Sequence, residues 1–244
     1  MNVHRITAGF LLLAASPAAA SPSVRSFASA FFVSRDGDGH IEVLGTGVTW
    51  LLLCMSATAI GLAIAMAMDN RRGSIMPDGF VEAMQGDIDA NRFREALGRA
   101  TASESFIGGI MSDAMKQAPH GWTAVVRALE QASEERTVAR LRRIEILNII
   151  GQVSPMIGLF GTVYGMILAF SAIVASGGAA DPVMLAGGIG TALTTTFWGL
   201  VVAIPSLAAC AVLRGRIDAT TAEATLAAEA LLGRFRPRRN AESS

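Results

Sequence analysis

Residues 154–170 read Ser154-Pro-Met-Ile-Gly-Leu-Phe-Gly-Thr-Val-Tyr-Gly-Met-Ile-Leu-Ala-Phe170. This stretch lies inside a longer segment, residues 146–180, that contains no charged side chain. A helix needs about 20 apolar residues to cross the hydrocarbon core of a bilayer, and the segment exceeds that length. The sequence therefore predicts a transmembrane helix over residues 144–176.

Two further segments have the same character. Residues 43–68 and residues 183–213 contain no charged side chain, and each is long enough to cross a bilayer with some tilt. The short linker 177–182, which ends in Asp181 and Pro182, predicts a tight turn between antiparallel helices. We therefore expect an all-α membrane protein with three transmembrane helices.

The remaining segments are more polar or have a processing pattern. Residues 1–20 combine a basic start, a short apolar run and Ala18-Ala19-Ala20, which is typical of a secretory signal peptide, with an uncleaved anchor as the alternative. Residues 21–42 would then be a periplasmic segment. Residues 69–143 predict a cytoplasmic helical region with breaks at Pro77 and Pro119, and residues 214–244 predict a cytoplasmic C-terminal helix and tail.

The orientation follows from the distribution of basic residues, which are enriched on the cytoplasmic side of membrane proteins. The turn 177–182 has no Lys or Arg, whereas Arg214 and Arg216 follow the third span. The region after the first span is rich in basic residues: Arg71, Arg72, Arg92, Arg94, Arg99, Lys116, Arg127, Arg136, Arg140, Arg142 and Arg143. We predict a multi-pass protein of the bacterial inner membrane with a periplasmic N-terminus and a cytoplasmic C-terminus.

The composition argues against several classes of protein. Of the 244 residues, 52% are hydrophobic, and 20 basic residues balance 20 acidic ones, so no basic face for nucleic acid is expected. Cys54 and Cys210 lie in apolar runs, and no His, Cys or Asp cluster has the spacing of metal ligands. No nucleophile elbow, phosphate-binding loop or carboxylate pair is present. We expect neither an enzyme nor a bound cofactor.

Small residues form one stripe on each of the last two predicted spans when a rotation of about 100° per residue is applied. Thr162 and Thr196 lie near the centres of these stripes. Close helix packing of the GxxxG kind explains the glycines, but a polar pathway remains an alternative reading for the threonines. The other members of the stripes are Gly158, Gly161, Gly165, Gly188, Ala192, Gly199 and Ala203.

The uncharged segments 43–68, 146–180 and 183–213 contain no Asp, Glu, His, Lys or Arg. A proton relay through a membrane needs such a group at depth. If the protein moves protons, another protein must supply the carboxylate.

The stretch from Ser154 to Phe170 resembles the second-span signature of the MotA/TolQ/ExbB proton-channel family. The third span is similar to that family's pattern of a Gly-Ile turn, an Ala-Leu-x-x-Thr core, Gly-Leu and Ala-Ile-Pro: Asp181-Pro-Val-Met-Leu-Ala-Gly-Gly-Ile-Gly-Thr-Ala-Leu-Thr-Thr-Thr-Phe-Trp-Gly-Leu-Val-Val-Ala-Ile-Pro205. The resemblance implies an ExbB-like or TolQ-like scaffold that forms a homopentamer around an ExbD-like or TolR-like single-span protein. The partner's membrane aspartate would carry protons, Thr162 and Thr196 would line its path, and a TonB-like or TolA-like protein would deliver the resulting motion.

One position departs from the family pattern. Many ExbB and TolQ members have Glu near the start of the Ala-Leu-x-x-Thr core, where this chain has Thr191. Thr191, Thr194 and Thr195 point away from the Thr196 stripe, so we predict that they pack between subunits. The exported N-terminal segment favours an ExbB-like uptake system. A TolQ-like envelope or motility role, a structural scaffold and a solute transporter are the alternatives.

Overall fold

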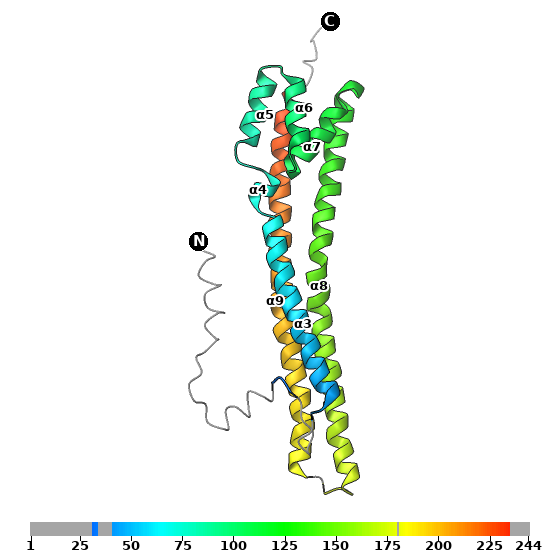
Figure 1. The fold of residues 1–244 in the computed structure, drawn as a ribbon. Helices are drawn as coiled ribbons and strands as arrows, with labels where there is room; N and C mark the ends of the chain where they lie inside the picture. The colour runs from blue at the N-terminus through cyan, green and yellow to red at the C-terminus, as the bar shows by residue number, and fades with distance from the viewer. Residues whose placement is uncertain (1–30, 34–40, 180, 235–244) are drawn as a thin grey trace, which may run out of the picture. The chain divides into compact units, whose positions relative to one another are not determined.

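The computed structural model describes residues 31–33, 41–179 and 181–234 (Figure 1). Within these ranges the chain forms helices joined by turns and contains no strand, so the all-α prediction is confirmed. The predicted signal peptide, most of the segment 21–42 and the end of the C-terminal tail lie outside the described residues. The helices are α3 (Val43–Asp69), α4 (Arg72–Ile75), α5 (Phe80–Asp89), α6 (Phe93–Ala102), α7 (Phe106–Lys116), the 3-10 helix η2 (Ala118–His120), α8 (Trp122–Ala175) and α9 (Pro182–Gly233).

Among the described residues, three helices are long and apolar enough to cross a membrane, namely α3, α8 and α9. The predicted spans 43–68 and 183–213 lie within α3 and α9, and α8 contains all of 144–176 except Ser176, which confirms the expectation of three membrane-spanning helices. Helices α8 and α9 have 54 and 52 residues and continue far beyond the uncharged segments. Pro155 and Pro205 lie inside α8 and α9 without ending them.

The chain divides into two compact units. Residues 1–51 and 157–198 form the first unit, and residues 52–156 and 199–244 form the second. Helices α3, α8 and α9 therefore contribute one part to each unit.

In the first unit, small residues bring α8 and α9 together. A Cβ atom at Gly165 would lie 2.5 Å from the carbonyl oxygen of Gly188 and 2.7 Å from the backbone nitrogen of Ala192. A Cβ atom at Gly188 would in turn lie 2.7 Å from the carbonyl oxygen of Gly165. Side chains would separate the helices at these positions, so glycine is what permits backbone contact.

The second unit has two apolar cores. The larger core joins α4 to α7 with the beginning of α8 and the end of α9, and Met84, Ile107, Ile110, Met111 and Leu129 are almost fully buried in it. The smaller core packs the second half of α3 against α8 and α9 through Met66, Ile144, Leu147, Leu213 and Ile217. These cores give the polar part of the chain a fixed structure of its own.

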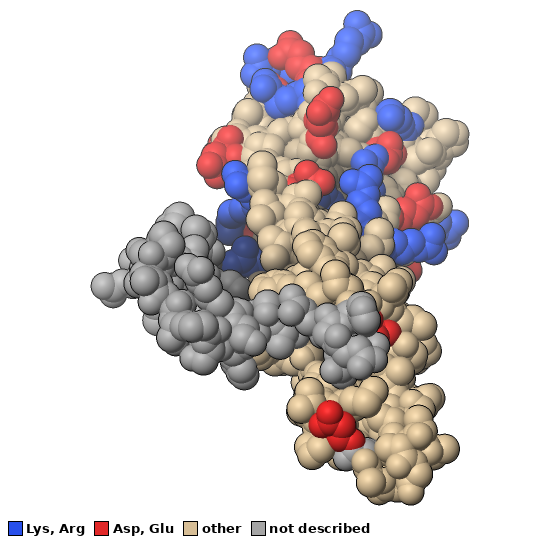
Figure 2. Space-filling model, turned by 60° about the horizontal axis from the view of Figure 1, so that its bottom comes forward, with Lys and Arg blue, Asp and Glu red and all other residues tan. Residues whose placement is uncertain are grey.

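Charged side chains are unevenly distributed over the surface. Figure 2 shows the Lys and Arg side chains gathered over one part of the visible face, together with much of the Asp and Glu, whereas the rest of that face has no blue and little red. Large apolar side chains stand exposed along α8, among them Met156, Leu159, Ile167 and Phe170. An exposed apolar surface of this kind is what lipid or neighbouring membrane helices cover.

Candidate functional site

The α8–α9 contact in the first unit contains both threonines that the sequence analysis selected. Gly161 of α8 packs directly against the side chain of Thr195 of α9. Thr162 and Thr196 each follow one of these contact residues, so each side chain is rotated by about 100° from the centre of the contact. The two threonines accordingly lie at the margin of the packed face, and both are partly exposed.

The hydroxyl group of Thr196 lies within reach of α8. Its hydroxyl oxygen lies 3.4 Å from the carbonyl oxygen of Gly158 and 3.2 Å from that of Ala192. Gly158 is one helical turn before Thr162 on α8, so Thr162 and Thr196 lie about one turn apart along this helix. The structure therefore brings the two residues to the same stretch of the α8–α9 contact.

Both hydroxyl groups already donate within the chain. Thr162 Oγ1 donates to the carbonyl oxygen of Leu159 at 2.6 Å, and Thr196 Oγ1 donates to the carbonyl oxygen of Ala192 at 3.2 Å. Such bonds satisfy a hydroxyl hydrogen inside a membrane helix but leave the oxygen lone pairs available as acceptors. The pair can accept hydrogen bonds from water or from a protonated acid, but a threonine hydroxyl does not titrate and cannot carry a proton itself.

Known proteins are similar to this chain in the region of α8 and α9. A model of the MotA/TolQ/ExbB proton channel family matches residues 101–225, which is more than half of the chain and includes α8 and most of α9. The chain belongs to the MotA/TolQ/ExbB proton channel family. The resemblance stated from the two span motifs is thereby confirmed.

Several relatives share the same membership. The chain is 40% identical over 80 residues to biopolymer transport protein exbB1 of Vibrio cholerae, and this match covers 33% of this chain and 35% of the relative. It is 36% identical over 138 residues to a putative biopolymer transport protein ExbB homolog of Methanothermobacter thermautotrophicus, covering 57% and 48%. It is 38% identical over 94 residues to the Tol-Pal system protein TolQ of Haemophilus influenzae, covering 38% and 41%. The match thus spans less than half the length of each relative.

Thr191, where many members of the MotA/TolQ/ExbB family have Glu, is buried within the chain, as is Thr195. Their relative exposures are 5% and 1%. The prediction of a subunit contact is wrong for Thr195, which packs against Gly161 of α8 in the same chain, and the burial of Thr191 within the chain argues against such a contact there as well. Thr194 is half-buried, and its assignment to a subunit contact stays a prediction.

The other selected residues divide between the two units. Gly158, like Gly161 and Gly165, is buried in the first unit, whereas Gly199 and Ala203 are buried in the second. At the turn, Asp181 Oδ1 accepts a hydrogen bond from the backbone nitrogen of Val183 at 2.9 Å, and Pro182 is the first residue of α9. Both turn residues thus mark the beginning of α9.

An acidic residue that the sequence analysis placed outside the spans contacts α8 in the first unit. Glu42 accepts hydrogen bonds from the backbone nitrogens of Leu44 and Gly45 at 3.2 and 2.6 Å, which caps the first turn of α3. It also accepts a hydrogen bond from Tyr164 Oη at 2.6 Å. Tyr164 is only two residues after Thr162. Sequence reasoning missed this contact because it joins residues 122 positions apart.

Two amide side chains form a row of hydrogen bonds along the part of α8 that belongs to the second unit. Gln152 Nε2 donates to Asn148 Oδ1 at 3.0 Å, and Asn148 Nδ2 donates to Glu145 Oε1 at 2.6 Å. The other oxygen of Glu145 accepts from Arg214 Nη2 at 3.0 Å. Asn148 and Gln152 do not titrate, so the distribution of charged residues does not reveal them. Their spacing of four residues nevertheless puts them on one helix face.

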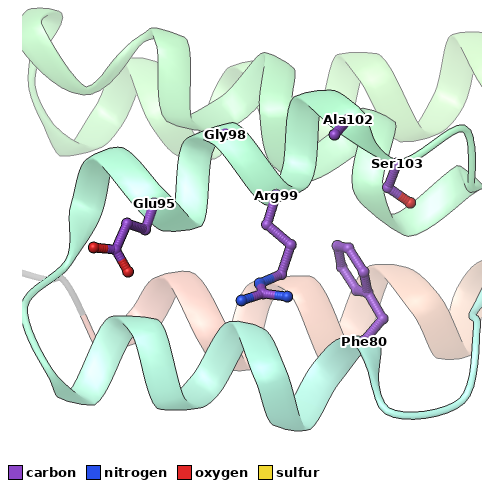
Figure 3. Close-up of a pocket in the computed structure, with 6 residues that line it drawn as sticks. All are labelled: Phe80, Glu95, Gly98, Arg99, Ala102 and Ser103. Atoms are coloured by element: carbon purple, nitrogen blue, oxygen red, sulfur yellow. The ribbon is translucent and has the colours of Figure 1, made fainter.

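The short helices carry a separate open hollow of about 590 Å³ beside α5 and α6. Figure 3 shows Arg99 reaching from α6 toward α5, with Phe80 next to it. The Arg99 guanidinium donates to the buried carboxylate of Asp87 at 2.8 Å, and Arg92 forms a second ion pair with it at 3.0 Å. The ion pair between Asp87 and Arg99 joins α5 to α6, so we assign this hollow a structural role.

Proposed function

We propose that this chain is the scaffold subunit of a proton-driven complex of the MotA/TolQ/ExbB family. In this proposal α8 and α9 of several copies surround the membrane helix of a partner, and Thr162 and Thr196 face that helix. The partner supplies a membrane aspartate as the proton carrier. The hydroxyl oxygens of the two threonines then accept hydrogen bonds from water or from the protonated carboxyl group.

A single observation carries the proposal. The α8–α9 contact holds two threonines at its exposed margin, in a stretch of α8 and α9 that contains no charged side chain. A self-contained proton channel would need a titratable group there. The arrangement supports a role as one half of a pathway, completed by a second protein.

Within the family, we propose an ExbB-like role: a homopentamer with an ExbD-like partner that powers outer-membrane uptake through a TonB-like protein. The ExbB names of two of the relatives support this assignment. A TolQ-like role with TolR-like and TolA-like partners is the second candidate, favoured by the similarity to the Haemophilus protein. The predicted location is the inner membrane, with the N-terminus periplasmic and the C-terminus cytoplasmic.

Copurification tests the assembly. The full chain is expressed with a tagged single-span protein from the same genome that has an aspartate in its membrane segment, and the complex is weighed by native mass spectrometry. We expect five copies of this chain with the partner. Recovery of the chain only as a monomer, with and without every such partner, would contradict the proposal.

A further inference from the structure

A second polar site lies in the second unit, beside the end of α3 and the last charged turns of α8. It is a hollow of about 340 Å³ between α3, α4, α7 and α8. Three arginines of α8 line it, namely Arg136, Arg140 and Arg143, together with Asp69 at the end of α3. The uncharged segment of α3 ends at Met68 and that of α8 begins at Ile146, so we expect the hollow at the level where lipid headgroups border the hydrocarbon core.

Two of the arginines are held in place by neighbouring elements. Arg136 Nη2 donates to Asp113 Oδ2 at 2.8 Å, and its guanidinium group packs where a Cβ atom on Gly109 would lie 2.5 Å away. Arg140 Nη1 donates to Asn70 Oδ1 at 2.9 Å, and its guanidinium carbon lies 5.9 Å from the centre of the Phe106 ring. The guanidinium groups are therefore ordered before any ligand binds, which lowers the entropic cost of binding.

The third arginine is available to a ligand. Arg143 is exposed, and it forms no ion pair within the described parts of the chain. Arg136, Arg140 and Arg143 are spaced by four and three residues, so they share one face of α8 and repel one another. Partial burial and this repulsion by Arg143 and Arg136 lower the pKa of Arg140, although Asp69 opposes the effect. A bound anion would relieve the repulsion.

Two acids also line the hollow, and they restrict where an anion fits. Asp69 lies beside Arg140, and Glu104 is exposed on the opposite wall before α7. Arg136 is already paired with Asp113, so Arg140 and Arg143 are the guanidinium groups left to meet an anion. The anion must therefore bind on their side of the hollow. A phosphate group offers acceptor oxygens that match the planar donors of arginine.

We propose that this hollow binds a phosphate group through Arg140 and Arg143. An anionic lipid headgroup and free inorganic phosphate share this chemistry, and the position at the membrane edge favours the lipid. The site is separate from Thr162 and Thr196, so the inference does not depend on the proton pathway.

The test uses the full chain, purified in detergent and titrated by calorimetry at constant ionic strength. The titrants are short-chain phosphatidylglycerol, short-chain phosphatidylcholine and inorganic phosphate. We expect saturable binding of phosphatidylglycerol and none of phosphatidylcholine. Saturable binding of inorganic phosphate as well would also support the site and would show that the phosphate group alone is recognised. Absence of saturable binding for both anions would overturn the proposal.

Three variants connect the binding to this hollow. Arg143→Gln, which breaks no ion pair, should weaken anion binding by about tenfold, as expected for the loss of one charge-assisted contact. Glu104→Gln removes a competing negative charge and should tighten it. Arg142→Gln is the matched control, because Arg142 is exposed at the adjacent position and does not line the hollow. Equal weakening by Arg142→Gln and Arg143→Gln would show unspecific attraction and would overturn the site.

Discussion

At the scale of single residues, Thr162 and Thr196 owe their position to the residues before them. Gly161 and Thr195 form the tight contact between α8 and α9, and each following threonine is turned to the margin of that contact. The helical rotation predicted that the two threonines lie near the centres of the small-residue stripes, whereas in the structure both lie at the margin of the contact. It could not show that the centre of the contact is at Thr195, because a helical wheel gives a face but does not identify its neighbour.

Replacing both threonines by valine tests their role. Thr162→Val with Thr196→Val preserves side-chain volume and removes the hydroxyl oxygens, so we expect the complex to assemble and its proton-driven transport to fall to background. Thr58→Val is the control, because Thr58 is an exposed residue of α3 whose hydroxyl donates to the carbonyl oxygen of Cys54 at 2.8 Å. Full transport by the double variant would exclude the pore-lining role.

The buried carboxylate of Asp87 should matter for stability. Asp87→Asn removes the charge that Arg92 and Arg99 contact, and hydrogen bonds to charged groups contribute about 1.5–3 kcal/mol. We expect the midpoint of thermal unfolding of the short-helix region to fall by several degrees, measured by circular dichroism in detergent. Glu95→Gln is the comparison, because Glu95 is exposed and pairs only with Arg92 at 3.3 Å. An equal effect of the two changes would contradict this account.

At the scale of helices, the sequence predicted where α3, α8 and α9 cross the membrane but not how far α8 and α9 continue. The absence of charge marks residues that tolerate hydrocarbon, and this signal ends where charged residues begin. The helices do not end there, because the polar parts of α8 and α9 pack into the two apolar cores of the second unit. The breaks predicted at Pro77 and Pro119 are present, before α5 and within η2.

Replacement by alanine should affect the stability of the protein differently at two nearby glycines of α9. Gly188→Ala would press a methyl group against the backbone of Gly165 and Ala169, and overpacking of this kind costs about 1–3 kcal/mol. At Gly190 no atom lies within 4 Å of the added Cβ, so Gly190→Ala should leave stability unchanged or raise it by about 0.5–1 kcal/mol. Thermal unfolding in detergent measures both, and a destabilised Gly190→Ala variant beside a stable Gly188→Ala variant would refute the packing argument.

At the scale of the whole molecule, the contact between Glu42 and Tyr164 bears on the conclusion that a second protein supplies the proton-carrying carboxylate. The three uncharged segments contain no Asp, Glu, His, Lys or Arg, but the carboxylate that caps α3 hydrogen-bonds to Tyr164 of α8. Glu42 also accepts two backbone hydrogen bonds, which tie it to the first turn of α3. We therefore retain the view that the mobile proton is carried by a second protein.

Proton flux into liposomes tests this central claim most directly. The full chain is reconstituted alone and together with a single-span partner that has a membrane aspartate, and a pH-sensitive dye inside the vesicles reports the flux under an imposed potential. We predict flux only when both proteins are present, and its loss when the partner's aspartate is changed to asparagine. Flux through this chain alone, at the rate of the complete complex, would contradict the account.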